Sequence, residues 1–334
     1  MDKNGRTPLS WAAAEGQLEV VKLLLEKEGA DVDCKDKNGR TPLSWAAAEG
    51  QLEVVKLLLE MEGVNVDCKD ENGQTPLLWA AAVGQLEVIR LLLKKEGVDV
   101  DCKDKNGRTL LWRAAAVGQL EVVKLLLKKE GVNIDCKDKD SWTPLLQAAA
   151  GGKLEVVKLL LKKGGVDVDC KDEDGRTPLW WAAAGGKWEV VKLLLEMEGV
   201  DVDCKDEDGR TPLWWAAARE QWEVVKLLLE KEGVDVDCKD KYGRTPLWWA
   251  AAVGQLEVVK LLLKKEGINV DCKNEDGRTP LWQAAVEGQL EVVKLLLEKK
   301  GVDVNCKDEY GQTLLSQAIA EGQWEVVKML KAAI

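Results

Sequence analysis

Residues 2–35 read DKNGRTPLSWAAAEGQLEVVKLLLEKEGADVDCK, and the rest of the chain repeats this 34-residue pattern. Nine repeats are complete, and the tenth stops within its second half. A fixed period of this length is typical of a stacked array, in which each unit buries its apolar face against its neighbours. We therefore predict one domain, residues 1–334, made of ten repeats: 2–35, 36–69, 70–103, 104–137, 138–171, 172–205, 206–239, 240–273, 274–307 and 308–334. We number the positions within a repeat as slots, with slot 1 at Asp2.

The first half of a repeat predicts a turn followed by a short helix. Asp2 and Gly5 are turn residues, because Asp bonds its own backbone and Gly accepts a positive φ. Thr7 and Pro8 are suited to the N-cap and the first helical position. We expect this helix to run to about Glu15 and to end at a left-handed glycine in slot 15.

The second half predicts a more apolar helix, from about Gln17 to Lys27, ended by Gly29. Its leucines and valines cover well over half of the helical wheel, so this helix must be covered on several sides. Glu19, Lys22 and Glu26 form the remaining narrow strip and mark the side that faces solvent. The repeat therefore predicts two helices that stack against those of the flanking repeats.

The composition argues against several classes of function. The net charge is −11, with acidic and basic residues interleaved along the chain, which argues against nucleic acid or an anionic membrane as the main partner. The apolar runs are far shorter than the roughly 20 residues that a membrane-spanning helix needs, and the start of the chain carries no targeting signal. We therefore expect no membrane association.

All nine cysteines occupy slot 33: Cys34, Cys68, Cys102, Cys136, Cys170, Cys204, Cys238, Cys272 and Cys306. Repeats stacked roughly 8–10 Å apart would hold equivalent cysteines too far apart for disulfides. Free thiols predict a reducing, cytoplasmic setting. Because the chain has no histidine and no closely spaced cysteine pair, we expect these side chains to fill a tight corner and to bind neither metal nor cofactor.

The repeat resembles the ankyrin repeat throughout the chain. The resemblance rests on this frame: Gly5, Thr7-Pro8-Leu9, Ala12-Ala13, Gly16, Val20-Val21, Leu23-Leu24-Leu25 and Gly29-Ala30-Asp31-Val32. It implies an all-α repeat solenoid, curved and elongated, with a β-turn and two antiparallel helices per repeat. It also implies binding of protein partners through the turn tips and the first helix. One departure is that the histidine usual after Thr-Pro-Leu is here Ser, Leu or Trp.

Variation among the repeats concentrates in slots 9, 10 and 14, on or beside the outward side of the short helix. Slot 10 holds six of the fifteen tryptophans, and each indole can offer on the order of 150–250 Å² of surface. Six in register would form an apolar patch of roughly 1,000 Å², larger than is usual on a monomer. We predict that this stripe binds a partner protein. The alternative, which can coexist with it, is that the tryptophans pack over the neighbouring repeat and tighten the stack.

The predicted partner-binding residues come from slots 5, 9, 10 and 14, with the densest group in repeats six to eight, where Trp188 and Trp222 lie nearby at slot 17. They are Trp11, Trp45, Trp79, Trp112, Arg113, Trp142, Trp180, Trp181, Trp214, Trp215, Arg219, Trp248, Trp249 and Trp282. The slot-5 arginines, such as Arg6 and Arg40, are expected to be solvated or paired locally.

Enzymatic activity is not expected, because without histidine the usual Ser-His or Cys-His pairs cannot form, and no phosphate-binding glycine loop exists. Two alternatives to a protein-binding scaffold remain. One is a designed or consensus-like structural array without a natural ligand. The other is single-stranded nucleic acid, or another planar ligand, stacked on the tryptophans. The first and last repeats carry no polar cap, so we expect an array taken from a larger protein and end-to-end stacking of copies.

Overall fold

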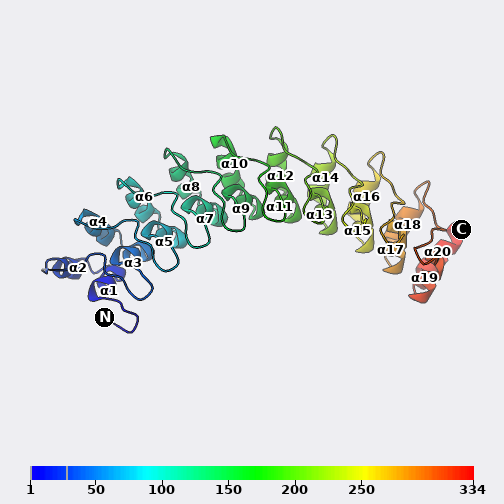
Figure 1. The fold of residues 1–334 in the computed structure, drawn as a ribbon. Helices are drawn as coiled ribbons and strands as arrows, with labels where there is room; N and C mark the ends of the chain where they lie inside the picture. Colours follow the sequence, from blue (N-terminus) through cyan, green and yellow to red (C-terminus); the bar gives the residue numbers. More distant parts are fainter. Residues whose placement is uncertain (1, 28) are drawn as a thin grey trace. The chain divides into compact units, whose positions relative to one another are not determined.

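The computed structural model describes residues 2–27 and 29–334 and divides the chain into two compact units, unit 1 (Met1–Asp167) and unit 2 (Val168–Ile334). Each unit holds two rows of helices, one from the first helix of every repeat and one from the second (Figure 1). Apart from a bridge between Lys307 and Thr313, the regular structure of the described residues is helical. The predicted all-α repeat solenoid is confirmed, and the organisation as one domain stays a prediction.

Unit 1 contains ten helices in its described residues, two for each repeat. The first helices are α1 (Pro8–Ala14), α3 (Pro42–Glu49), α5 (Pro76–Val83), α7 (Leu110–Val117) and α9 (Pro144–Ala150). The second helices are α2 (Leu18–Leu25), α4 (Leu52–Glu60), α6 (Leu86–Lys94), α8 (Leu120–Leu127) and α10 (Leu154–Lys163).

Unit 2 repeats the same order. Its first helices are α11 (Pro178–Ala184), α13 (Pro212–Ala218), α15 (Pro246–Ala252), α17 (Pro280–Val286) and α19 (Leu314–Ala320). Its second helices are α12 (Trp188–Leu195), α14 (Trp222–Leu229), α16 (Leu256–Leu263), α18 (Leu290–Leu297) and α20 (Trp324–Ala333).

The turn and the helix start are formed as the sequence predicts. In repeat two, Asp36 Oδ1 accepts hydrogen bonds from the backbone N–H groups of Asn38 and Arg40, at 2.9 Å each. Thr41 caps α3 by accepting the N–H of Ser44, and Pro42 is the first helical residue. These bonds satisfy donors that a turn and a helix N-terminus would otherwise leave free.

Hydrogen bonds also join each repeat to the next. The slot-16 glutamine reaches the carbonyl at the end of the preceding first helix, as Gln51 Nε2 does with Ala14 O at 3.0 Å. The slot-26 lysine reaches the end of the preceding second helix, as Lys95 Nζ does with Leu59 O at 2.8 Å. Each bond gives a partner to a carbonyl near a helix end.

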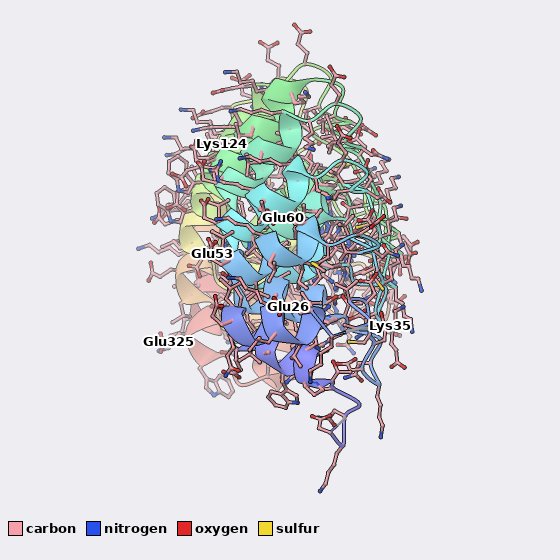
Figure 2. All side chains as sticks on the ribbon, turned by 90° about the vertical axis from the view of Figure 1, so that its left-hand side faces the viewer. Glu26, Lys35, Glu53, Glu60, Lys124 and Glu325 are labelled. Carbon is pink, nitrogen blue, oxygen red and sulfur yellow. The ribbon has the colours of Figure 1, made fainter. Side chains whose placement is uncertain are left out.

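The core lies between successive helices and is made of small and branched side chains. In repeat two, Leu43, Ala46, Ala47 and Val55 are fully buried. The charged strip of the second helix faces solvent, where Lys56 pairs with Glu53 at 2.6 Å. Figure 2 shows Glu53 on the helical side of unit 1 and Lys35 on its loop side.

The second helices end slightly earlier than predicted. The predicted end was about slot 26, followed by the slot-28 glycine, and most second helices end at slot 24 or 25, as α2 does at Leu25. In repeat three, Lys95 at slot 26 already has an extended backbone. Among the described helices, α10 and α20 reach slot 26, at Lys163 and Ala333, and Gly164 follows α10 with a φ of 79°.

Two non-glycine residues occupy left-handed backbone positions. Ser141, in the fifth turn, has a φ of 63°, and Glu220, at slot 15 of repeat seven, has a φ of 59°. Both stand where the repeat otherwise has glycine, so the backbone keeps the shape of the other repeats in spite of the substitution. None of the helices in residues 2–27 and 29–334 is both long and apolar enough to cross a bilayer.

Candidate functional site

The slot-10 tryptophans lie at the surface of the first helices but are held to the fold. Trp11 is 43% exposed, and the five others are half-buried. Five of these indoles donate Nε1–H to the slot-1 aspartate of their own repeat, as Trp45 does to Asp36 Oδ2 at 3.1 Å. The outward side was predicted correctly. The expectation of a row of indoles standing in water was wrong, because these hydrogen bonds and stacked neighbours cover part of each ring.

The slot-9 tryptophans are buried, contrary to the expectation that they flank the open stripe: Trp112, Trp180, Trp214, Trp248 and Trp282. Slot 9 is directed into the space between two repeats. There Trp180 Nε1 donates to the carbonyl of Arg210 in the next turn, at 3.2 Å, and Trp214 donates to that of Arg244 at 2.9 Å. These rings tighten the stack, which was the alternative role considered above.

In unit 2 the indoles of slots 9 and 10 form a continuous ladder. The ring of Trp180 lies 5.2 Å from that of Trp181 and 5.3 Å from that of Trp215. Trp214 lies 5.4 Å from Trp215 and 5.6 Å from Trp249. All are edge-to-face contacts, which aromatic rings favour. Trp180 and Trp214 thus each support one half-buried slot-10 ring on either side, and Trp248 supports Trp249 alone, at 5.7 Å.

In the first three repeats of unit 1, guanidinium groups take the place of the slot-9 rings. Arg6 Cζ lies 4.4 Å from the ring of Trp11 and 3.2 Å from that of Trp45. Arg40 Cζ lies 4.7 Å from the ring of Trp45 and 3.9 Å from that of Trp79. Such cation–π contacts are favourable, more so when partly desolvated. The result is an alternating stack of indoles and guanidiniums.

The slot-5 arginine has different contacts in repeats that carry serine at slot 9 and in repeats that carry tryptophan there. Slot 9 is serine in repeats one and two, and there the arginine lies between two indoles. In repeats six to eight slot 9 is tryptophan, and the arginine bonds its own slot-1 aspartate instead, as Arg210 does with Asp206 at 2.9 Å. Arg108 departs from this pattern because Arg113, at slot 10, already pairs with Asp104 at 2.6 Å.

The other predicted polar and turn residues are part of local networks. Arg219 is exposed, stacks on Trp215 at 4.6 Å, and donates to the carbonyl of Ala184 at 3.3 Å. Trp142 is half-buried in the fifth turn, and its carbonyl accepts the Nε1–H of Trp112 at 3.1 Å. Each of these residues is therefore held by contacts within its own unit.

The family model of ankyrin repeats matches nearly the whole chain, at residues 1–70, 58–138, 114–206, 186–274 and 266–333. The chain belongs to the ankyrin repeat family. Ankyrin repeats in general mediate protein–protein interaction and are non-catalytic. A comparison with curated proteins gave no match.

The exposed apolar residues of this ankyrin array extend beyond the predicted list. Trp188 and Trp222, at the starts of α12 and α14, are 46% and 47% exposed. Val83, Val117 and Val253 are exposed at slot 14. Their departure from the commonest residue of each slot is the sequence signal that singles them out.

The cysteines of the array are buried next to the N-capping threonines. Cys34 is half-buried and the other eight are buried, all as free thiols. Thr177 Oγ1 lies 2.9 Å from Cys204 Sγ, and burial raises the pKa of this thiol to about 12. The predicted role as a small side chain in a tight corner is confirmed for these eight. Among the described residues, no group of three or more His, Cys, Asp or Glu is placed to hold a metal ion.

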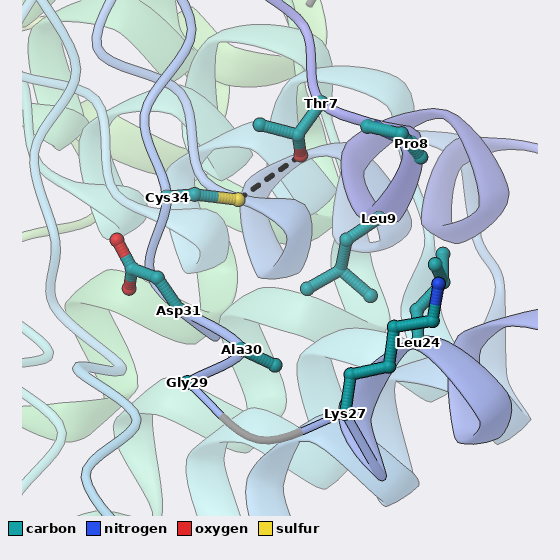
Figure 3. A pocket seen from close by; sticks show the side chains of 9 residues that line it. All are labelled: Thr7, Pro8, Leu9, Leu24, Lys27, Gly29, Ala30, Asp31 and Cys34. Atoms are coloured by element: carbon teal, nitrogen blue, oxygen red, sulfur yellow. Dashed lines mark hydrogen bonds between the residues drawn. The ribbon is translucent and has the colours of Figure 1, made fainter.

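The first repeat has an open groove of about 450 Å³, lined by both of its helices and by the loop that follows them. Figure 3 shows Leu9 and Leu24 facing it, with the hydrogen bond between Thr7 and Cys34 at its back. On the same repeat, Leu23 is 63% exposed, whereas the equivalent leucines of the next repeats are half-buried. The expectation that the first repeat exposes apolar surface is therefore confirmed.

Proposed function

We propose that this ankyrin array is a non-catalytic scaffold that binds a partner protein through its turn tips and the slot-10 face of its first helices. The observation that supports this most is the fixed, half-exposed state of the slot-10 indoles. Each is held by a hydrogen bond to aspartate, or by stacked indoles and guanidiniums. Because these indoles are already fixed, they lose little conformational entropy when a partner docks on them. Aromatic side chains also contribute strongly to the binding energy of protein interfaces.

We also propose a cytoplasmic location for the protein. Nine free thiols favour a reducing, cytoplasmic location. The lack of histidine supports a role without acid–base or nucleophilic catalysis.

Peptides selected from a displayed random library on the intact chain would test the proposal. The test variant is Trp181→Gln/Trp215→Gln/Trp249→Gln, because Gln147, Gln283 and Gln317 show that slot 10 accepts glutamine in this chain. The matched control is Glu189→Gln/Glu223→Gln/Glu257→Gln, on the charged strip of the second helices. We expect the dissociation constant of selected peptides to rise at least about tenfold in the tryptophan variant and to stay unchanged in the control.

Other results would favour the alternatives. Failure to select any binding peptide would support a structural array without a ligand. Tryptophan fluorescence quenched by oligothymidylate, and not by peptides, would support stacking of single-stranded nucleic acid on the indoles.

A further inference from the structure

The turn arginines of the first two repeats have N–H groups that are free to bind a ligand. Arg6 and Arg40 lie between indoles, and neither guanidinium makes a hydrogen bond within residues 2–27 and 29–334. The closest carboxylate to Arg40 is that of Asp70, at 3.8 Å from Nε. The Arg40 side chain is 22% exposed, and its Nε is buried, so its terminal Nη groups are the ones that meet solvent. A planar group fixed in this way suits bidentate pairing with a carboxylate.

Three of the four equivalent arginines of unit 2, Arg176, Arg210 and Arg244, are already paired with aspartate, whereas Arg278 has Asn274 at slot 1 of its repeat. Arg176 pairs with Asp172 at 2.9 Å and also with Asp174. Arg210 pairs with Asp206 at 2.9 Å and with Asp208 at 2.7 Å. Their charge is therefore neutralised within their own turns.

The exposed turn tips of unit 1 are also less acidic than those of unit 2. In unit 1, slot 2 is an exposed lysine in four of five repeats (Lys3, Lys37, Lys105 and Lys139), and slot 3 is asparagine in four. In unit 2, slot 2 is an exposed glutamate in four of five repeats (Glu173, Glu207, Glu275 and Glu309), and slot 3 is aspartate in three. The slot-34 lysines occur in every complete repeat and do not alter this contrast. The interleaving of charges along the chain thus hides a turn edge in unit 1 that is much less acidic than the turn edge of unit 2, with lysine beside both Arg6 and Arg40.

We propose that the turn edge and the indole–guanidinium stack of unit 1 bind an extended, acidic segment of a partner protein. Its carboxylates would pair with Arg6 and Arg40, beside the slot-2 lysines, while its apolar groups lie on Trp11, Trp45 and Trp79. Packed helices lie roughly 8–10 Å apart and an extended chain rises about 3.3 Å per residue, so an acidic residue at about every third position matches the repeats. The acidic balance of the whole chain disfavours a nucleic acid, in which every residue carries a phosphate.

This inference rests on the proposed function and specifies its partner. The test uses the full chain and fluorescence anisotropy at low salt with three labelled probes of about fifteen residues: a peptide with glutamate at every third position, the same peptide with glutamine, and oligothymidylate. The variant is Arg6→Gln/Arg40→Gln, since Gln74 shows that slot 5 accepts glutamine. The matched control is Arg210→Gln/Arg244→Gln in unit 2, and thermal unfolding verifies that both variants fold.

We expect the glutamate peptide to bind the unaltered chain, with an affinity that falls as salt is added. Its dissociation constant should rise at least about tenfold in the Arg6/Arg40 variant and less than about threefold in the control. Three results would overturn the assignment to an acidic segment. The glutamine peptide could bind as tightly as the glutamate peptide, the control variant could lose as much affinity as the Arg6/Arg40 variant, or the glutamate peptide could fail to bind. These results would leave the tryptophan-dependent binding proposed above standing, which the slot-10 variants test separately. Tighter binding of oligothymidylate, lost in the Arg6/Arg40 variant, would assign the edge to nucleic acid instead.

Discussion

Glu220 has the left-handed backbone that glycine has at slot 15 of the other repeats, with a φ of 59°. A side chain in this conformation costs about 1 kcal/mol relative to glycine. The corner is also crowded, because a Cβ added at the equivalent Gly254 would lie 2.1 Å from Gln289 Oε1 of the next repeat.

We therefore predict that Glu220→Gly raises the unfolding free energy by about 1 kcal/mol and raises the melting temperature, measured by calorimetry or circular dichroism. The reverse change, Gly254→Glu, should lower the melting temperature. A melting temperature of Glu220→Gly that is unchanged or lower would mean that the corner had rearranged.

The cysteines should differ in reactivity according to their burial. Burial raises the pKa of Cys204 and Cys238 to about 12, from an ordinary 9.0. Their thiolate fraction near neutral pH is then about a thousandfold lower than that of an ordinary thiol. We predict that alkylation by iodoacetamide, followed by mass spectrometry, modifies Cys34 first, because it lines the open groove. Equal rates at all nine cysteines would show that the repeats open faster than the reagent reacts.

Residue-level prediction succeeded where local chemistry decides the outcome and failed where two repeats meet. The capping threonines and the turn aspartates follow from short-range rules, and both were confirmed. The burial of Trp180 and Trp214 was missed, because a helical wheel for one repeat places slot 9 beside slot 10 but does not include the neighbouring turn that covers it.

At the scale of the helix, the slot-9 rings of unit 2 should contribute strongly to stability. Trp214 lies between two slot-10 rings and donates a hydrogen bond to the next turn. We predict that Trp214→Leu folds, because Leu78 and Leu146 occupy slot 9 fully buried, but loses about 2–3 kcal/mol through the space left behind. Urea unfolding would measure the loss.

The matched control for this substitution is Trp188→Leu at slot 17, where leucine is the commonest residue and Trp188 is exposed. Its effect should stay within about 0.5 kcal/mol. A similar loss in both variants would show that the ladder adds no stability beyond ordinary apolar contact.

The helices themselves were predictable because ten copies of one pattern agree on where each begins. Their ends were less so, because most second helices stop one or two residues before the predicted end near slot 26. The candidate face could be located from the variation in slots 9, 10 and 14. The sandwiched Arg6 and Arg40 were not foreseen, because their position depends on the empty space beside a serine in slot 9.

At the scale of the whole molecule, a set of loop aspartates makes stability depend on pH. Burial raises the pKa of Asp33, Asp135, Asp203, Asp237 and Asp271. The folded chain therefore binds protons at these groups more readily than the unfolded chain does. Their unfavourable contribution at neutral pH is lost as the pH falls through the folded-state pKa values.

We predict that the unfolding free energy rises as the pH is lowered from 7 towards the folded-state pKa values of these aspartates, which lie above the ordinary 3.8, as measured by urea unfolding. In the variant Asp203→Asn/Asp237→Asn, the unfolding free energy should change less with pH. This variant distinguishes the effect of these two groups from the weaker charge repulsion that any chain with a net charge of −11 gains on protonation. A stability that falls over this range would contradict the prediction.

We propose that copies of this chain associate through the exposed apolar residues of the first and last repeats. Leu23 and the groove beside Leu9 and Leu24 are open, and Trp324, in the last repeat, is 62% exposed. We expect sedimentation to show assembly that grows with concentration and is reduced by Leu23→Lys but not by Glu19→Lys. A single monomeric species at high concentration in the unaltered chain would contradict this.

The residue at slot 9 of a repeat accompanies a difference in whether the slot-5 arginine is available to a partner. With serine at slot 9, in repeats one and two, the turn arginine lies between two indoles. With tryptophan there, in repeats six to eight, it pairs with the slot-1 aspartate of its own turn. Exchange or duplication of whole repeats would therefore change which partners the surface binds, while the buried leucines, valines and alanines stay the same.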